Sequence, residues 1–166
     1  EVIRIRGQQA ELQVFEDTAD LRVGDAVEFT GELLSVELGP GLLGSIYDGL
    51  QNPLPELAAQ GGFFLQRGQY LDPLDRTKEW AFTPVAKPGL TVQAGDTLGT
   101  VPEGIFQHRI MVPFRLRGQL TVEEIAGAGR YRVTHVIAKL KDEQGRRHEV
   151  ALLQRWPVKL PIKAYA

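Results

Sequence analysis

Apolar and polar residues alternate along much of this chain, which is typical of β-strands that bury one face. In the first part of the chain the alternation is clearest where Ala10, Leu12 and Val14 share one side. The pattern predicts strands at residues 9–16, 26–29 and 33–38. Gly39-Pro40-Gly41 then ends it, because proline cannot donate to a strand ladder and glycine tolerates positive φ. We therefore expect residues 1–38 to form strands of a small barrel or sheet.

Residues 39–62 follow a different spacing. Apolar side chains recur every three or four residues between Leu42 and Leu50, which predicts helical turns there. Asn52-Pro53 should stop those turns. Pro55 to Gln60 then predicts a second short helix with proline at an early position, and Gly61-Gly62 should end it. We expect this stretch to be a connector that holds all of the helix in the chain.

From residue 63 the alternation returns and continues to Pro157, which predicts a second β unit. Its expected strands lie at 63–65, 80–82, 108–112, 119–125, 131–139 and 149–153. Polar residues 72–79 predict a surface loop, and Asp142 to Gly145 predicts a hairpin loop with glycine near its end. The predicted fold is mainly β in four parts, which are residues 1–38, 39–62, 63–157 and an exit linker at 158–166.

Composition removes several classes of function. The net charge is −2 and the sequence pI is about 6.0, so nucleic acid is not an expected partner. The absence of cysteine excludes disulfides and thiolate zinc sites. No apolar run approaches the ~18 residues that a membrane span needs, and the N-terminus lacks the apolar region of a signal peptide.

The segment LGSIYDGLQNPL, residues 43–54, resembles a motif of the catalytic A subunits of vacuolar-type and archaeal-type rotary ATPases. Residues 14–25 and 36–41 resemble the end of that subunit's N-terminal β-barrel and the stretch that follows it. Asn52 departs from the motif, because the family often has arginine there. Further matches follow in the family's order at Leu74-Asp75-Arg76, Trp80 to Pro84, Lys87-Pro88-Gly89, Gly99 to Glu103, Ile110 to Pro113, Gly118 and Trp156-Pro157-Val158.

The resemblance covers nearly the whole chain and implies a fragment of an A subunit. Residues 1–38 would be a remnant of the N-terminal barrel, and residues 63–157 the family's bulge, or non-homologous region. No glycine precedes a lysine anywhere in the sequence, so a phosphate-binding loop is missing. We therefore expect no catalytic, cofactor-binding or metal-binding residues here, and neither tight ATP binding nor hydrolysis. ATP and Mg²⁺ would belong to the parent subunit, which is the enzyme.

For the parent, the resemblance implies a ring of three A and three B subunits, peripheral to a membrane and cytoplasmic. Expected partners are the B subunits and the peripheral stalk, with the central stalk reached indirectly. The exposed face of residues 63–156 would contact the peripheral stalk. Strands in residues 1–38 would have open edges, so they could be disordered, dock elsewhere or pair between chains. The sequence does not indicate whether the parent pumps protons or sodium ions, or whether it mainly makes or hydrolyses ATP.

Residues 85–120 also resemble biotinyl and lipoyl carrier domains, which have a barrel-sandwich hybrid fold. The shared pattern includes Lys87, Gly89, Val92, Gly95, Asp96 and Leu98, with Pro113 and Gly118 further on. The carrier lysine would lie within Gly104 to Gln107, where the sequence is Gly-Ile-Phe-Gln. The resemblance therefore implies the carrier fold without its swinging-arm chemistry. An autonomous binding module of this type is the alternative to an ATPase fragment.

Four other groups of side chains are candidates for binding, catalytic or structural sites. His108, His135 and His148 are the only imidazoles, and their spacing does not predict a metal site. Asp72, Asp75 and Glu79 would serve a small hydrolase as paired carboxylates, but their polar setting favours a solvated loop. Trp80 and Phe82 are expected in the core rather than in a stacking platform for bases. Asp48 is expected to accept backbone hydrogen bonds or to face a neighbouring domain.

Overall fold

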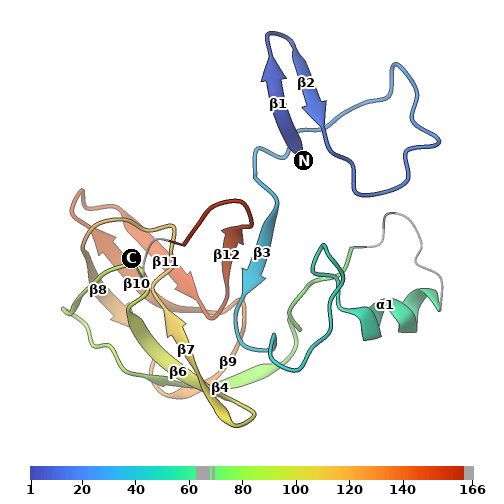
Figure 1. The fold of residues 1–166 in the computed structure, drawn as a ribbon. Coiled ribbons are helices and arrows are strands. Elements are labelled where there is room, and N and C mark those ends of the chain that lie inside the picture. The colour runs from blue at the N-terminus through green and yellow to red at the C-terminus, as the bar shows by residue number, and fades with distance from the viewer. Residues whose placement is uncertain (63–67, 69, 163–166) are drawn as a thin grey trace.

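The computed structural model describes residues 1–62, 68 and 70–162, and these form a mainly β structure with a single helix (Figure 1). The helix is α1 (Leu54–Gly61), and every strand pairing is antiparallel. The strands are β1 (Val2–Arg6), β2 (Gln9–Leu12), β3 (Ser35–Leu38), β4 (Glu79–Pro84), β5 (Thr91–Val92), β6 (Thr97–Glu103), β7 (Phe106–Met111), β8 (Leu120–Ile125), β9 (Gly129–Arg132), β10 (Val136–Asp142), β11 (Arg147–Ala151) and β12 (Gln154–Pro157).

Strands β4 to β11 form what we call the sandwich, which consists of two four-stranded sheets. One sheet has the order β11-β10-β8-β5 and the other β7-β6-β4-β9. Apolar side chains from both sheets form one buried cluster, with Phe82, Leu98 and Leu140 at most 1% exposed. The predicted second β unit with a barrel-sandwich fold is thus confirmed over these strands.

Alternation along β4 shows how the sequence builds this core. Trp80 and Phe82 point inward and are buried, whereas Glu79, Ala81 and Thr83 are exposed. Phe82 packs closely against the backbone of β6, and a Cβ at Gly99 would overlap the Phe82 ring. A side chain at position 99 would therefore force the two strands apart.

Residues 1–34, which we call the arm, have no core of their own. Strands β1 and β2 form a hairpin that stands apart from the sandwich (Figure 1). Within this fully described range no residue is buried. Its large apolar side chains are exposed at Ile3, Ile5, Leu12, Val14, Phe15, Leu21, Val23, Val27, Phe29 and Leu33.

The arm joins the sandwich through β3, which pairs with β12 at the far end of the chain. Four residue pairs connect them, from Gln154 opposite Leu38 to Pro157 opposite Ser35. The predicted strand at 33–38 is therefore confirmed in its second half, and it docks onto a partner more than a hundred residues away. The prediction at 9–16 is confirmed for β2.

Two predictions in the first part of the chain were wrong. Residues 26–29 are irregular and exposed rather than a strand, because no neighbouring strand offers them a ladder. Residues 42–50 form turns instead of helix, with Gly44 at φ 80°. The Asp48 carboxylate binds the backbone N–H groups of Leu50 and Asn52, which stabilises a turn in place of helical bonds. The helix predicted at 55–60 is confirmed as α1, with Gly62 after its end at φ 70°.

Residues 131–139 are not one long strand. The chain turns at 133–135 between β9 and β10, so each strand joins a different sheet. Val133 is fully buried, and its carbonyl accepts a hydrogen bond from the N–H of Leu153. The strands predicted at 108–112, 119–125 and 149–153 correspond to β7, β8 and β11, with shifted ends. The apolar run at 63–65 lies outside the described residues.

Candidate functional site

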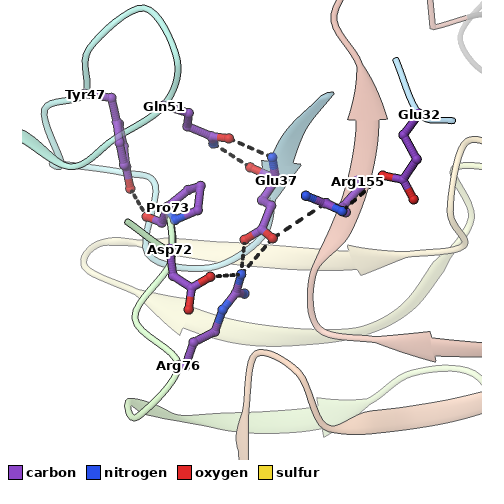
Figure 2. A network of polar contacts seen from close by, with 8 residues as sticks. All are labelled: Glu32, Glu37, Tyr47, Gln51, Asp72, Pro73, Arg76 and Arg155. Atoms are coloured by element: carbon purple, nitrogen blue, oxygen red, sulfur yellow. Dashed lines mark hydrogen bonds and ion pairs between the residues drawn. The ribbon is translucent and has the colours of Figure 1, made fainter. Parts of the chain in front are cut away.

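Glu37 lies where the arm, the connector and the sandwich meet, and it is the centre of a polar network (Figure 2). This residue of β3 is only 7% exposed. Arg76 Nη2 lies 2.7 Å from both of its carboxylate oxygens, and Arg155 Nε lies 3.8 Å from Oε1. A buried carboxylate needs such cationic partners, because without them its charge would be strongly destabilised.

Arg76 binds a second acid, since its Nη2 donates to Asp72 Oδ1 at 3.0 Å. Burial works to lower the pKa of Arg76, but the hydrogen bonds and charges of Asp72 and Glu37 outweigh burial and raise it. Its guanidinium therefore stays charged, and the loop before β4 is tied to β3.

Gln51 holds the backbone of Glu37 from the side opposite β12. Its Oε1 accepts from the Glu37 N–H and its Nε2 donates to the Glu37 carbonyl, both at 2.7 Å (Figure 2). The side-chain amide thus replaces one residue of a third strand. Gln51 has a φ of 66°, a conformation that non-glycine residues rarely adopt. Tertiary contacts must therefore compensate a local strain at this position.

Residues 70–76, which we call the brace, contact three separate parts of the chain. Tyr70 donates to Glu16 of the arm at 2.8 Å. The Leu71 N–H donates to the buried Asn52 side chain at 3.1 Å, and the Pro73 carbonyl accepts from Tyr47 at 3.0 Å. Arg76 completes the set through Glu37, while Leu74 is 1% exposed and belongs to the core cluster of the sandwich.

Glu103 of the sandwich binds the start of the connector through hydrogen bonds. This 5%-exposed residue of β6 accepts from the N–H groups of Gly41 at 2.6 Å and Leu43 at 3.1 Å. Its second oxygen lies 2.7 Å from His108 Nδ1. The sequence did not identify Glu103, Glu37 or Gln51 as functional, because nothing in the local pattern marks them and the partners that join them to other segments lie 14 to 62 residues away.

Asp48 accepts hydrogen bonds, as expected. Its Oδ1 takes the N–H groups of Leu50 and Asn52, and its Oδ2 takes the Asn52 side chain. Burial works to raise the pKa of Asp48, but the hydrogen bonds from Asn52 and Leu50 outweigh burial, so the pKa is lowered. The carboxylate therefore keeps the turn shape that leads into α1.

The structure does not bring the three histidines together. His108 of β7 pairs with Glu103 of β6, and His148 of β11 lies 3.0 Å from Asp142 of β10. His135 stacks on Tyr131, with ring centroids 4.8 Å apart. Among the described residues no group of three or more histidines and carboxylates is placed to hold a metal ion.

The other candidates have structural partners. Asp72 pairs with Arg76, Asp75 binds the backbone and hydroxyl of Thr77, and Glu79 pairs with Arg130 at 3.5 Å. Their separate partners give no acid–base pair. Trp80 and Phe82 are 7% and 1% exposed, so both lie in the core as expected.

The resemblance to biotinyl and lipoyl domains would place their lysine-bearing hairpin at β6 and β7. Its turn includes Gly104 at φ 60° and Ile105, which is 93% exposed. The tip is therefore apolar and offers no amine for a covalent cofactor. In the described part of the chain, no helix combines the length and apolar character needed to cross a bilayer.

Comparison with protein families agrees with this architecture. The model of the ATP synthase alpha/beta subunit barrel-sandwich domain matches residues 71–159. The chain belongs to this ATP synthase alpha/beta family. The model of the ATP synthase alpha/beta family β-barrel domain also matches residues 1–31, which lie in the arm. The two family domains thus correspond to the arm and to the sandwich with its flanking segments.

Relatives in the ATP synthase alpha/beta family include V-type ATP synthase alpha chains of spirochaetes. The chain is 58% identical to alpha chain 1 of Treponema pallidum and 58% identical to the alpha chain of Treponema denticola, over 166 residues each. It is 54% identical over 165 residues to that of Borreliella burgdorferi. These matches cover 99–100% of the chain but only 28–29% of the relatives.

Proposed function

We propose that this chain is a noncatalytic, structural portion of the alpha chain, or A subunit, of a V-type ATP synthase that transports protons or sodium ions. One observation carries the proposal: the sandwich buries its own apolar core, whereas the arm exposes ten large apolar side chains. Exposed apolar surface of this kind marks a binding surface for another protein segment. The two units therefore suit two different contacts.

The arm suits assembly. Ile3, Ile5 and Leu12 lie on one face of the β1–β2 hairpin, and a two-stranded hairpin is marginally stable without further strands. In the complete subunit, further strands of the β-barrel domain would cover this face. The completed barrel would then contact the B subunits in a ring of three A and three B subunits.

The sandwich suits a contact that resists torque. The outer face of its β11-β10-β8-β5 sheet carries Lys139 and Lys141 beside Arg147 and Glu124. Lys139 lies 2.7 Å from Glu124, and such exposed pairs contribute little to folding. A rigid β unit with a charged outer face suits the peripheral stalk, because charge complementarity selects and orients a partner.

ATP and Mg²⁺ do not fit the residues present. A phosphate cradle needs glycine N–H groups followed by a lysine, and this sequence has no glycine–lysine pair. The N–H groups of Gly41 and Leu43 already bind Glu103. We expect the purified chain to show no ATP turnover above background, and measurable turnover would contradict the proposal.

A binding experiment on two variants tests the assembly roles. The chain is mixed with purified B subunits and, separately, with purified peripheral stalk, and complexes are measured by size-exclusion chromatography. Ile3→Ser with Ile5→Ser should weaken B-subunit binding and spare the stalk. Lys139→Glu with Lys141→Glu should weaken stalk binding and spare the B subunits. The proposal is wrong if the unchanged chain binds neither partner, or if both variants affect both partners equally.

A further inference from the structure

We propose that the brace, residues 70–76, fixes the direction of the arm relative to the sandwich. It acts within the chain, so this role does not depend on which partners the arm and sandwich bind. Four of its seven residues contact the arm at Glu16, the connector at Asn52 and Tyr47, and strand β3 at Glu37. Points of attachment on three elements remove more freedom than the same number on one element.

The arm needs such a brace because packing does not orient it. No residue of 1–34 is buried, so no apolar core holds the arm against the sandwich. On the β12 side, three contacts hold the arm. The Val158 N–H donates a hydrogen bond to the Leu34 carbonyl. Arg155 forms an ion pair with Glu32, and Lys159 forms one with Glu1. These contacts all come from residues 155–159, so they hold the arm from one side only.

The connector and the brace supply the opposing support. Gln51 of the connector binds the backbone of Glu37 on the edge of β3 that faces away from β12, and Arg76 of the brace binds the Glu37 carboxylate (Figure 2). Strand β3 is consequently held on one edge by β12, on the other edge by the Gln51 amide, and through its Glu37 side chain by the brace. Tyr70 adds a contact with Glu16, in the arm beyond β2. The brace itself is rigid at its base, because Leu74 is buried in the core of the sandwich.

Gln51 supports this assignment independently. Its left-handed backbone conformation is unfavourable for a residue other than glycine and persists only where surrounding contacts impose it. Here the conformation places the amide where it binds both backbone groups of Glu37. The strain is therefore located at the point where the connector meets the strand that carries the arm.

Distance measurements between two spin labels test the brace. The chain has no cysteine, so Gln9→Cys on β2 and Glu143→Cys on the β10–β11 turn give two specific labelling sites. Pulsed electron paramagnetic resonance then reports the distribution of arm–sandwich distances. With the brace intact we expect one narrow distribution. Arg76→Gln with Tyr70→Phe should replace it with a broad distribution.

Two further variants separate bracing from general damage. Tyr70→Phe removes one exposed hydroxyl and leaves the buried Glu37 network intact, so the chain should fold normally and show a smaller broadening. Arg147→Gln removes the ion pair with Glu123 inside the sandwich and should leave the distribution narrow. An unchanged width in Tyr70→Phe and in the double variant, or equal broadening in Arg147→Gln, would overturn the proposal.

Discussion

The arm and the sandwich use the same strand-forming residues with opposite results. Phe82 in the sandwich is 1% exposed, whereas Phe29 in the arm is 64% exposed. Both regions alternate apolar and polar residues, and each contains antiparallel pairs. The difference is the number of layers, because the sandwich has a second sheet to receive its apolar face and the hairpin has none. Alternation thus specifies which side of a strand is apolar, and the opposing layer decides whether burial follows.

The comparison also shows where polar groups matter most. Inside the sandwich, position is set by close packing of apolar side chains. At the junction, where Glu37, Gln51 and Arg76 meet, position is set by the buried Glu37 carboxylate and its half-buried amide and guanidinium partners. Hydrogen bonds are directional, so they can hold two units at a defined angle without a shared apolar core. Substitutions in each region therefore have different expected effects.

Removing a large core side chain should have the largest effect. Phe82→Ala is expected to lower the free energy of unfolding by about 3–5 kcal/mol, because it deletes buried contacts and leaves a cavity. Ile5→Ala in the arm, where the side chain is 68% exposed, should stay within about 0.5 kcal/mol. Urea unfolding followed by tryptophan fluorescence measures both. Equal losses would show that the arm contributes to the same cooperative unit.

Adding one methyl group to the core should have the next largest effect. Gly99→Ala would overlap the Phe82 ring and place Cβ 2.7 Å from the Thr83 carbonyl oxygen. Overpacking of this kind costs about 1–3 kcal/mol. Gly49→Ala is the matched control, since a Cβ there meets no atom within 4 Å. A neutral result for Gly99→Ala in urea unfolding would contradict the close approach of β4 and β6.

Removing the side chain that holds the connector should lower stability by a comparable or smaller amount, and the change should be confined to the connector. Glu103→Ala leaves the N–H groups of Gly41 and Leu43 without their acceptor, at a cost of about 1–3 kcal/mol. Hydrogen exchange of these two amides should accelerate while core amides of β10 stay protected. Glu79→Ala removes only an exposed pair and should change stability by about 0–1 kcal/mol. Unchanged exchange at Gly41 would refute the role of Glu103.

Acid should weaken the β10–β11 hairpin through Asp142. Burial works to raise the pKa of Asp142, but hydrogen bonds from His148 and Arg146 outweigh it and hold the pKa well below its usual range. A lowered pKa contributes stability above the ordinary value of about 3.9, and that stability is lost as pH falls toward the folded-state value. Asp142→Asn should therefore flatten the fall in thermal stability below pH 4, and Glu143→Gln should not. Parallel pH curves for Asp142→Asn and the unchanged chain would contradict this prediction.

The smallest effect is expected at alkaline pH, in the arm. The hydrogen bond to Glu16 raises the pKa of Tyr70, followed by burial and the Glu16 charge. A raised pKa contributes stability below the ordinary value of about 10, and that contribution disappears as pH rises through the folded-state value. The labelled chain should therefore broaden its distance distribution above that pH, whereas Tyr70→Phe should show no such step. A step of equal size in both would assign the change to another group.

Much of the sandwich could be predicted from the sequence, because its strands carry alternation strong enough to identify a buried face. The loop from Asp142 to Gly145 was also predicted, since its residues have specific backbone preferences. Errors arose where local spacing competed with tertiary partners. Residues 42–50 had helical spacing, yet the hydrogen bonds of Asp48 and the bond from Tyr47 to the brace hold them as turns.

The junction could not be predicted at all, for a physical reason. Glu37 looks like an ordinary exposed residue of an alternating strand, and Arg76 like part of a solvated loop. They become a partly buried pair only because β12 and the brace converge on β3. Residue type reveals that a side chain can carry charge, but only the fold determines whether water or another charge surrounds it.

The local sequence was enough to identify the β class, the apolar faces and the helix after Pro53. These follow from local chemistry, since alternation, proline and glycine act over a few residues. The tertiary structure decided that β3 pairs with β12, that residues 131–139 divide between two sheets, and that Glu37 joins the arm to the sandwich. Those outcomes depend on contacts between residues far apart in the chain, which no local pattern encodes.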